Sequence, residues 1–224
     1  FSIDLETDSI VSLKANIVGI SISHDKNITD KKASNFNTFY IPVAHSLLGD
    51  IDKNIAINIV LPLLKPLLEN EKIGKIGHNL KYEINVFSNY DIDLKGIKDD
   101  TFISDYLLNP ANTHALKEIS KAHLHYFMTP ITELIGKGKT EITINNSPLA
   151  EVAKYAGADS AVTLELSFYL RDKLEIVSAL ELYEKMELPL VKVLSQMEQS
   201  GIKIDQAYLH TLSEKIDQML LVSE

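Results

Sequence analysis

The chain contains no cysteine, which excludes disulfide bonds, thiolate metal sites and a cysteine nucleophile. Any metal would therefore be held by oxygen or imidazole ligands. Arginine is nearly absent as well, since Arg171 is the only one. No run of about 18 apolar residues occurs and no signal-peptide pattern opens the sequence, so neither a membrane span nor a membrane partner is expected.

Positive charge is also scarce, because the formal net charge is −9. This balance argues against a protein that grips a long stretch of duplex nucleic acid through a basic face. It argues less against an enzyme that holds a few nucleotides around divalent cations, because carboxylate ligands add negative charge at such a site. The length of 224 residues fits one domain with an appendage, or two small domains.

The first part of the chain has the pattern of a small sheet. Residues 1–7, 16–24 and 37–45 are predicted strands, and the polar stretch 25–37 is predicted to be a hairpin loop. Three successive strands with hairpin connections predict an antiparallel meander.

Helical periodicity dominates after the meander. Short strands are predicted at 72–77 and around Ile97, and residues 126–146 are predicted to form one long mobile loop near substrate. The predicted helices cover 55–70, 79–90, 100–109, 114–124 and 147–174. This order predicts an α/β fold with a small mixed sheet flanked by helices.

The character changes again near residue 176. One long helix is predicted over 180–200 with an interruption at Pro189, followed by a turn at 201–205 and a helix over 206–223. The sequence starts within a strand pattern and stops within a helix pattern, from which we expect a segment of a longer chain.

Asp4 and Glu6 are the first candidate functional residues. Residues two apart on a strand point to the same face, with Ile3 and Leu5 on the other. Two carboxylates on one face repel each other unless a cation lies between them. An exposed strand edge with ordinary acids is the alternative, and for this triplet alone it is favoured.

Glu83 ends the segment GHNLKYE, residues 77–83. Asn79 is predicted to cap the following helix, which places Glu83 in its first turn. An exposed glutamate favoured by the helix dipole is the alternative interpretation.

Tyr155 and Asp159 lie four residues apart in YAGAD, so they share one face of a predicted helix. A phenol and a carboxylate together can position a water molecule and a metal. A half-buried tyrosine beside an exposed acid is the plainer alternative.

Together, the three segments match the three motifs of DEDDy exonucleases: Asp-x-Glu on a first strand, an acid after Asn-x-x-x, and Tyr-x-x-x-Asp on a late helix. GHNLKYE resembles the GQNLKYD segment of proofreading domains. Further stretches at 134–139, 155–166 and 187–205 resemble the same family, the last one at its junction with the polymerase thumb. The sequence is therefore identified as similar, over nearly its whole length, to the exonuclease domain of family A DNA polymerases of the bacterial polymerase I type.

The resemblance implies a ribonuclease-H-like exonuclease fold with a five-stranded mixed sheet, divided into an exonuclease domain at 1–175 and the truncated start of a polymerase thumb at 176–224. It implies two-metal hydrolysis of the 3′-terminal phosphodiester of DNA, which releases nucleoside 5′-monophosphates. The metals implied are two Mg²⁺ or Mn²⁺ ions. The implied partners are single-stranded DNA or a frayed primer 3′ end and the remainder of the polymerase chain, in a cytoplasmic, nucleoid-associated bacterial protein.

The same resemblance implies roles for individual residues. Tyr155 orients the attacking water. The residues implied to bind metal are Asp4, Glu6, Glu83 and Asp159, of which Asp4, Glu6 and Asp159 hold one ion and Asp4 and Glu83 hold the other. Those implied to contact the substrate are Thr7, Ile10, Asn79 and Tyr82.

One position departs from the family pattern, because the middle motif usually ends in Asp and here ends in Glu83. The extra methylene moves the carboxylate by roughly 1.5 Å, and a misplacement on the order of 1 Å can cost ~100-fold in rate. Two alternatives therefore stay open. One is an inactive exonuclease-like domain that supports the polymerase or binds DNA, and the other is an RNA exonuclease of the ribonuclease D type.

Three smaller expectations complete the picture. The segment 176–224, separated from a polymerase, is expected to expose apolar side chains and either dock back onto the exonuclease or associate with another copy. Lys137 and Lys139 are candidate phosphate contacts, with a solvated loop as the alternative. The His123/His125 pair is assigned no metal role. The apolar side chains in question are Leu190, Val193, Leu194 and Met197.

Overall fold

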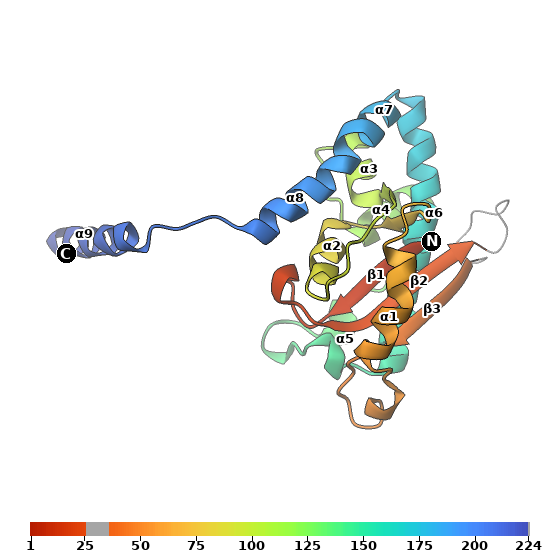
Figure 1. Cartoon of the computed structure of the whole chain (residues 1–224), viewed down its shortest axis with the longest axis horizontal. Helices are drawn as coiled ribbons and strands as arrows, with labels where there is room; N and C mark the ends of the chain where they lie inside the picture. The colour runs from red at the N-terminus through yellow and green to blue at the C-terminus, as the bar shows by residue number, and fades with distance from the viewer. Residues whose placement is uncertain (26–35, 224) are drawn as a thin grey trace.

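One five-stranded sheet organises the chain in the computed structural model, which describes residues 1–25 and 36–223 (Figure 1). The strand order is β3-β2-β1-β4-β5. The first three strands are antiparallel neighbours, whereas β4 runs parallel to β1 and β5 runs parallel to β4. The strands are β1 Ser2–Thr7, β2 Ile17–Asp25, β3 Phe36–Pro42, β4 Lys75–Gly77 and β5 Ile97–Asp100. The predicted meander and mixed sheet are confirmed, while residues 26–35 of the predicted hairpin loop lie outside the described residues.

β1 is the central strand, and its side chains alternate between two environments. Ile3 and Leu5 are buried in the main hydrophobic core. Ser2, Asp4 and Glu6 point to the opposite face, as the period of two requires. The predicted separation of acids from apolar residues on this strand is therefore confirmed.

Helix α6, Leu149–Ile176, covers the face of the sheet that carries the acids (Figure 1). Small hydroxyl residues join the two layers. Ser2 Oγ donates to the Ser160 carbonyl at 2.7 Å, and Ser21 Oγ lies 2.7 Å from Ser160 Oγ. This close contact brings the third turn of α6 beside β1 and β2.

Helices α1, Ile57–Leu68, and α2, Lys81–Ser88, belong to the main core on the other face. α1 forms a helix of 12 residues although it contains Pro62 and Pro66. The largest side chains of this core are fully or nearly fully buried, namely Ile3, Ile17, Ile20, Leu68, Leu80, Phe87 and Leu94. The buried apolar face of α2 fixes the helix that carries Glu83.

Helices α3, Thr101–Leu108, and α4, Leu116–Leu124, follow β5. They are joined by the buried Asp105, whose carboxylate contacts His114 Nδ1 at 2.6 Å and His123 Nε2 at 2.8 Å. His123 therefore has a structural partner, and no metal role is required to explain it. Single 3-10 turns lie elsewhere, at η1 Ser12–Lys14 and η3 Ile51–Lys53.

The predicted long loop at 126–146 is wrong in part. It contains a short helix α5, Thr132–Ile135, and two 3-10 turns, η4 Gly138–Thr140 and η5 Ile144–Asn146. The physical reason is Ile144, which is buried in a small cluster with Val18 and Val152 and anchors the segment to the sheet.

The C-terminal part is helical, as predicted. It consists of α7 Leu180–Leu182, the π-helical turn η6 Tyr183–Glu187, α8 Leu188–Ser200 and α9 Gln206–Ser223. The predicted interruption near Pro189 takes the form of the π-helical turn η6, which ends two residues before this proline; Pro189 itself lies in the first turn of α8.

The extension behaves in two ways. α8 packs against α2, and its Val191 is buried in the main core. α9 lies apart from the rest of the molecule, and its residues 206–222 are exposed (Figure 1). The predicted exposure is confirmed for Leu190, Val193, Leu194 and Met197, which are 39–64% exposed. Within the described residues, no helix is long and apolar enough to cross a membrane.

Candidate active site

Three carboxylates meet between β1 and α6. Asp4 and Glu6 come from β1 and Asp159 comes from α6, and one oxygen of each lies within 4.8 Å of the others. Glu6 is buried and the other two are partly buried. Two features bring these side chains together: the alternation of β1, and the third turn of a helix that packs on the same face.

The cluster is electrostatically unfavourable without a cation. Burial raises the pKa of Asp4 from 3.8 to about 6. The pKa of Glu6 is raised well above its ordinary value by burial, and then by the charges of Asp4 and Asp159. Burial and the charge of Asp4 likewise raise the pKa of Asp159. Three acids therefore hinder one another's ionisation. A divalent cation bound between them would favour their charged forms and stabilise the site.

Glu83 lies in the first turn of α2, as predicted, but the start of this helix differs from the prediction. Asn79 has a left-handed backbone with φ of 66° and its side chain does not cap the helix. The carboxylate of Asp100, at the end of β5, accepts hydrogen bonds from Asn79 N at 2.9 Å and Leu80 N at 2.7 Å. Because β4 and β5 are parallel neighbours, Asp100 ends beside the turn that opens α2 and replaces the expected cap.

Glu83 lies outside the group of three, but the negative charge of that group affects its pKa. It is 4% exposed, and its pKa is raised well above the ordinary value by burial and by the charge of Asp4. Glu83 Oε2 and Glu6 Oε1 are buried and accept no hydrogen bond from the residues that the structure describes. Buried carboxylate oxygens are rarely left without a partner. Two unpartnered oxygens in an oxygen-only donor set fit a divalent cation such as Mg²⁺ or Mn²⁺.

Tyr155 and Asp159 share one face of α6, as their spacing predicts. The Tyr155 hydroxyl lies near the Asp159 carboxylate, and the interaction lowers the pKa of Asp159 against the larger effect of burial. Burial and the nearby charges of Asp159 and Glu6 raise the pKa of Tyr155, so its phenol is protonated and can act as a hydrogen-bond donor.

The four residues expected on the substrate side fall in two places. Thr7 and Tyr82 are brought together, because their hydroxyls are in contact and Tyr82 also donates to the Ser9 carbonyl. These bonds hold the loop after β1 against α2. Ile10, in that loop, is 96% exposed, and Asn79 lies at the turn before α2.

Two hollows that the sequence did not reveal open beside Tyr155 and Asp159. One, of about 360 Å³, is bordered by α4 and the α5 region and includes Lys117, Ile131 and Lys137. The other, of about 260 Å³, includes Tyr126, Phe127 and Lys154. Lys137 was the one lysine here with a sequence clue, from its GKGK segment. The other lining residues gave none, because they come from three separate elements.

Tyr40 is a second residue that the sequence did not single out. Tyr40 lies opposite Ser21 on β2, and Ser21 lies opposite Asp4 on β1. Burial and the charges of Glu6 and Asp4 raise the pKa of Tyr40, and its hydroxyl lies 2.8 Å from His45 Nε2. A Cβ at Gly19 would meet the Tyr40 hydroxyl at 1.9 Å. Gly19 therefore makes room for this ring next to the site, which explains a glycine within β2.

Comparison with known proteins identifies the family. A family model described as 3′-5′ exonuclease matches residues 1–175. The chain belongs to this 3′-5′ exonuclease family. The match confirms the family and fold predicted from the three motifs. The division into two domains near residue 176 stays a prediction. The match ends at residue 175, but α8 beyond it packs against the exonuclease fold.

Curated relatives of this exonuclease domain are DNA polymerase I proteins. The DNA polymerase I of Rhizobium leguminosarum is 31% identical over 96% of the chain and 22% of its own length. That of Pseudomonas aeruginosa is 32% identical over 99% of the chain and 24% of its own length. The chain thus spans about a quarter of the length of these relatives.

Solved structures with the same exonuclease fold are more distant in sequence. The POL domain of Pol1 from M. smegmatis, in complex with DNA primer-template and dNTP, has a TM-score of 0.71 at 18% identity, over 96% of this chain and 31% of its own. NrnC of Brucella melitensis has a TM-score of 0.66 at 18% identity, over 89% of this chain and 84% of its own. At this identity the likeness establishes the fold alone.

Proposed function

We propose that the chain is a 3′→5′ exonuclease that hydrolyses the terminal phosphodiester of DNA, as the proofreading part of a polymerase of the DNA polymerase I type. The observation that carries this proposal is the cluster of Asp4, Glu6 and Asp159 with Glu83 beside it, including two buried oxygens without a partner. An inactive domain would have no need to keep four mutually repelling acids that are buried or partly buried.

Two divalent ions, Mg²⁺ or Mn²⁺, fit this arrangement. Asp4, Glu6 and Asp159 would hold one ion, and Asp4 and Glu83 would hold the second. When bound, the ions supply positive charge that activates water and stabilises the oxygens of the reacting phosphate. The glutamate in place of the family's aspartate is compatible with this role, because Glu83 Oε2 is buried and has no hydrogen-bond partner among the residues that the structure describes.

Tyr155 orients the attacking water. Its protonated hydroxyl lies near Asp159, and both residues line the larger hollow, where the water and the scissile phosphate would lie. Thr7, Tyr82 and the exposed Ile10 form the rim on the β1 side, and Asn79 lies at the turn before α2. These residues would contact the terminal nucleotide.

The hollows favour a single strand as substrate. They place lysines beside aromatic and apolar side chains, which suits a sugar-phosphate backbone with stacked bases. Lys117, Lys137 and Lys154 supply local positive charge in a chain whose net charge is −9. The proposed substrate is single-stranded DNA or a frayed primer 3′ end, and the remaining partner is the rest of a polymerase chain in the cytoplasm, at the nucleoid.

Degradation of 5′-labelled single-stranded DNA in Mg²⁺, Mn²⁺ or EDTA tests the proposal, with an RNA of the same sequence beside it. Metal-dependent shortening from the 3′ end that Asp4→Ala abolishes is expected, with nucleoside 5′-monophosphates as products. Asp172→Ala, an exposed acid on α6, is the matched control and should cut normally. No cutting with any metal would support the inactive alternative, and faster cutting of RNA would support the ribonuclease D alternative.

A further inference from the structure

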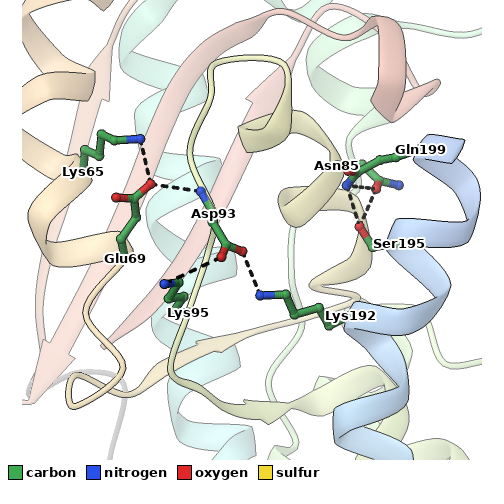
Figure 2. Close-up of polar contacts among 8 residues, drawn as sticks. All are labelled: Lys65, Glu69, Asn85, Asp93, Lys95, Lys192, Ser195 and Gln199. Carbon is green, nitrogen blue, oxygen red and sulfur yellow. Dashed lines mark hydrogen bonds and ion pairs between the residues drawn. The ribbon is translucent and has the colours of Figure 1, made fainter.

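The helical extension makes a polar interface with α2, the helix that carries Glu83. Asn85 lies two residues after Glu83 and is fully buried. Its Oδ1 accepts hydrogen bonds from Ser195 Oγ at 2.6 Å and Gln199 Nε2 at 3.2 Å, both from α8 (Figure 2). Its Nδ2 donates to Glu198 Oε2 at 2.7 Å. The amide of Asn85 is thus satisfied largely by the extension.

Weaker contacts surround this buried centre. Lys192 Nζ on α8 pairs with Asp93 Oδ1 at 2.9 Å (Figure 2), and Lys81 on α2 pairs with Glu198. Exposed ion pairs of this kind contribute little to stability. The burial of Val191 in the main core and the Asn85 hydrogen bonds therefore fix how α8 lies on α2.

A second contact between the extension and the exonuclease fold acts at the N-terminal end of α2. Tyr183, in the π-helical turn η6, is fully buried. Its hydroxyl donates to Asp99 and accepts the backbone N–H of Asp100 at 2.7 Å. The carboxylate of Asp100 in turn accepts the N–H groups of Asn79 and Leu80 at the start of α2. Tyr183 thus fixes the residue that caps the helix one turn before Glu83.

We propose that Tyr183 and Ser195 are positioning residues for Glu83, so that the extension beyond residue 176 is a working part of the exonuclease site. One holds the cap at the start of α2 and the other holds Asn85 on its side, and Glu83 lies between the two contacts. Both residues lie outside the 1–175 region that the family model matches. The inference rests on the proposed function, in which Glu83 holds a metal ion.

The expected size of the effect follows from how metal sites respond to their supporting residues. Loss of a residue that orients a ligand typically lowers metal affinity or activity about 10–100-fold. Tyr183→Phe removes only the hydroxyl and keeps the buried ring. Ser195→Ala removes the hydrogen bond to Asn85 and the one that Ser195 Oγ accepts from Gln199 Nε2 at 2.9 Å. Neither substitution touches the group of Asp4, Glu6 and Asp159.

Direct Mn²⁺ binding to the full chain, measured by titration calorimetry, tests the inference, with amide hydrogen exchange in EDTA as a second readout. Glu83→Ala is expected to lower the affinity for one of the two Mn²⁺ ions. Tyr183→Phe and Ser195→Ala are expected to lower the affinity for the same ion by about 10-fold and to leave the affinity for the other ion unchanged. Exchange should speed up in the peptide covering residues 77–88. Tyr208→Phe, an exposed tyrosine of the same extension, is the matched control and should change neither readout.

The outcomes separate the inference from the proposed function. If Glu83→Ala leaves Mn²⁺ binding unchanged, the metal role of Glu83 is wrong and the proposed function fails at that point. If Glu83→Ala weakens one ion but Tyr183→Phe and Ser195→Ala bind both ions like the wild type, the positioning inference is overturned. If Tyr183→Phe does not fold, Ser195→Ala alone decides by the same criterion. If the two variants lower the affinity for both ions equally, the substitutions loosen the whole fold, and the positioning inference is overturned as well.

Discussion

The acids of the site should destabilise the fold when no metal is bound, and Asp4→Asn measures this. The pKa of Asp4 is raised from 3.8 to about 6 in the folded protein. Because the folded-state pKa is the higher one, the folded protein loses stability as the pH rises from about 4 through 6 and Asp4 must ionise in place. A difference of about 2 pKa units corresponds to about 3 kcal/mol above pH 6.

Replacing the ionised side chain by a neutral amide of similar shape removes that cost. In EDTA at pH 8, we expect Asp4→Asn to be more stable than the wild type by up to about 3 kcal/mol. For a chain of this size that is a rise in melting temperature on the order of 6–12 °C. At pH 4 the two proteins should melt within a few degrees of each other, because Asp4 is then largely protonated in the folded state.

With divalent metal bound, the wild type should become the more stable of the two proteins. A ligand present at about 100 times its Kd stabilises the folded state by about 2.7 kcal/mol, and only the wild type retains the full set of carboxylates. Thermal melts of both proteins in EDTA and in Mn²⁺, at pH 4 and pH 8, therefore give a complete test. Asp172→Asn serves as the control and should follow the wild type throughout. If Asp4→Asn is no more stable than the wild type at pH 8 in EDTA, the electrostatic argument for the site is refuted.

Three further predictions concern single residues. Glu83→Asp withdraws the carboxylate by roughly 1.5 Å and should lower the rate of 3′-end cleavage about 10- to 100-fold, despite matching the family pattern; faster cleavage would mean that the glutamate is a defect. Tyr155→Phe should lower kcat by at least about 10-fold, while its Mn²⁺ affinity, measured by calorimetry, should stay within a factor of two of the wild type. Loss of one bound ion would contradict the proposal that Tyr155 only orients the attacking water. Asp105→Asn weakens the hydrogen bonds to His114 and His123 and should cost about 1–3 kcal/mol in urea unfolding, whereas an unchanged midpoint would show that this buried contact contributes nothing.

The parts of the fold that the sequence predicted are those set by local periodicity. The alternation of Ile3 and Leu5 with Asp4 and Glu6 gave both the strand and its two faces, and the spacing of Tyr155 and Asp159 gave their shared helix face. The mixed sheet followed from the order of these elements together with the family resemblance. The identity of the acids needed all three motifs, because each one alone had a plainer explanation.

The contacts that the sequence did not predict join residues far apart in the chain. Asp100 replaces Asn79 as the cap of α2 because β5 ends beside β4, which depends on strand order rather than on any local pattern. The lysines and aromatic side chains of the hollows come from α4, the α5 region and α6. The segment around Ile144 looked polar enough to be a loop, and one buried side chain was sufficient to order it.

The π-helical turn at Tyr183–Glu187 makes the helical extension unequally tolerant of changes in chain length. A π turn holds one residue more than an α turn. Deleting one residue there would close the wide turn to regular α-helical geometry and leave the residues that follow in phase. A deletion in the first turn of α8 would instead rotate everything that follows by about 100°. Val191 and Ser195 would then turn away from α2. One-residue deletions should therefore be tolerated better in the π turn than in the regular turns of α8.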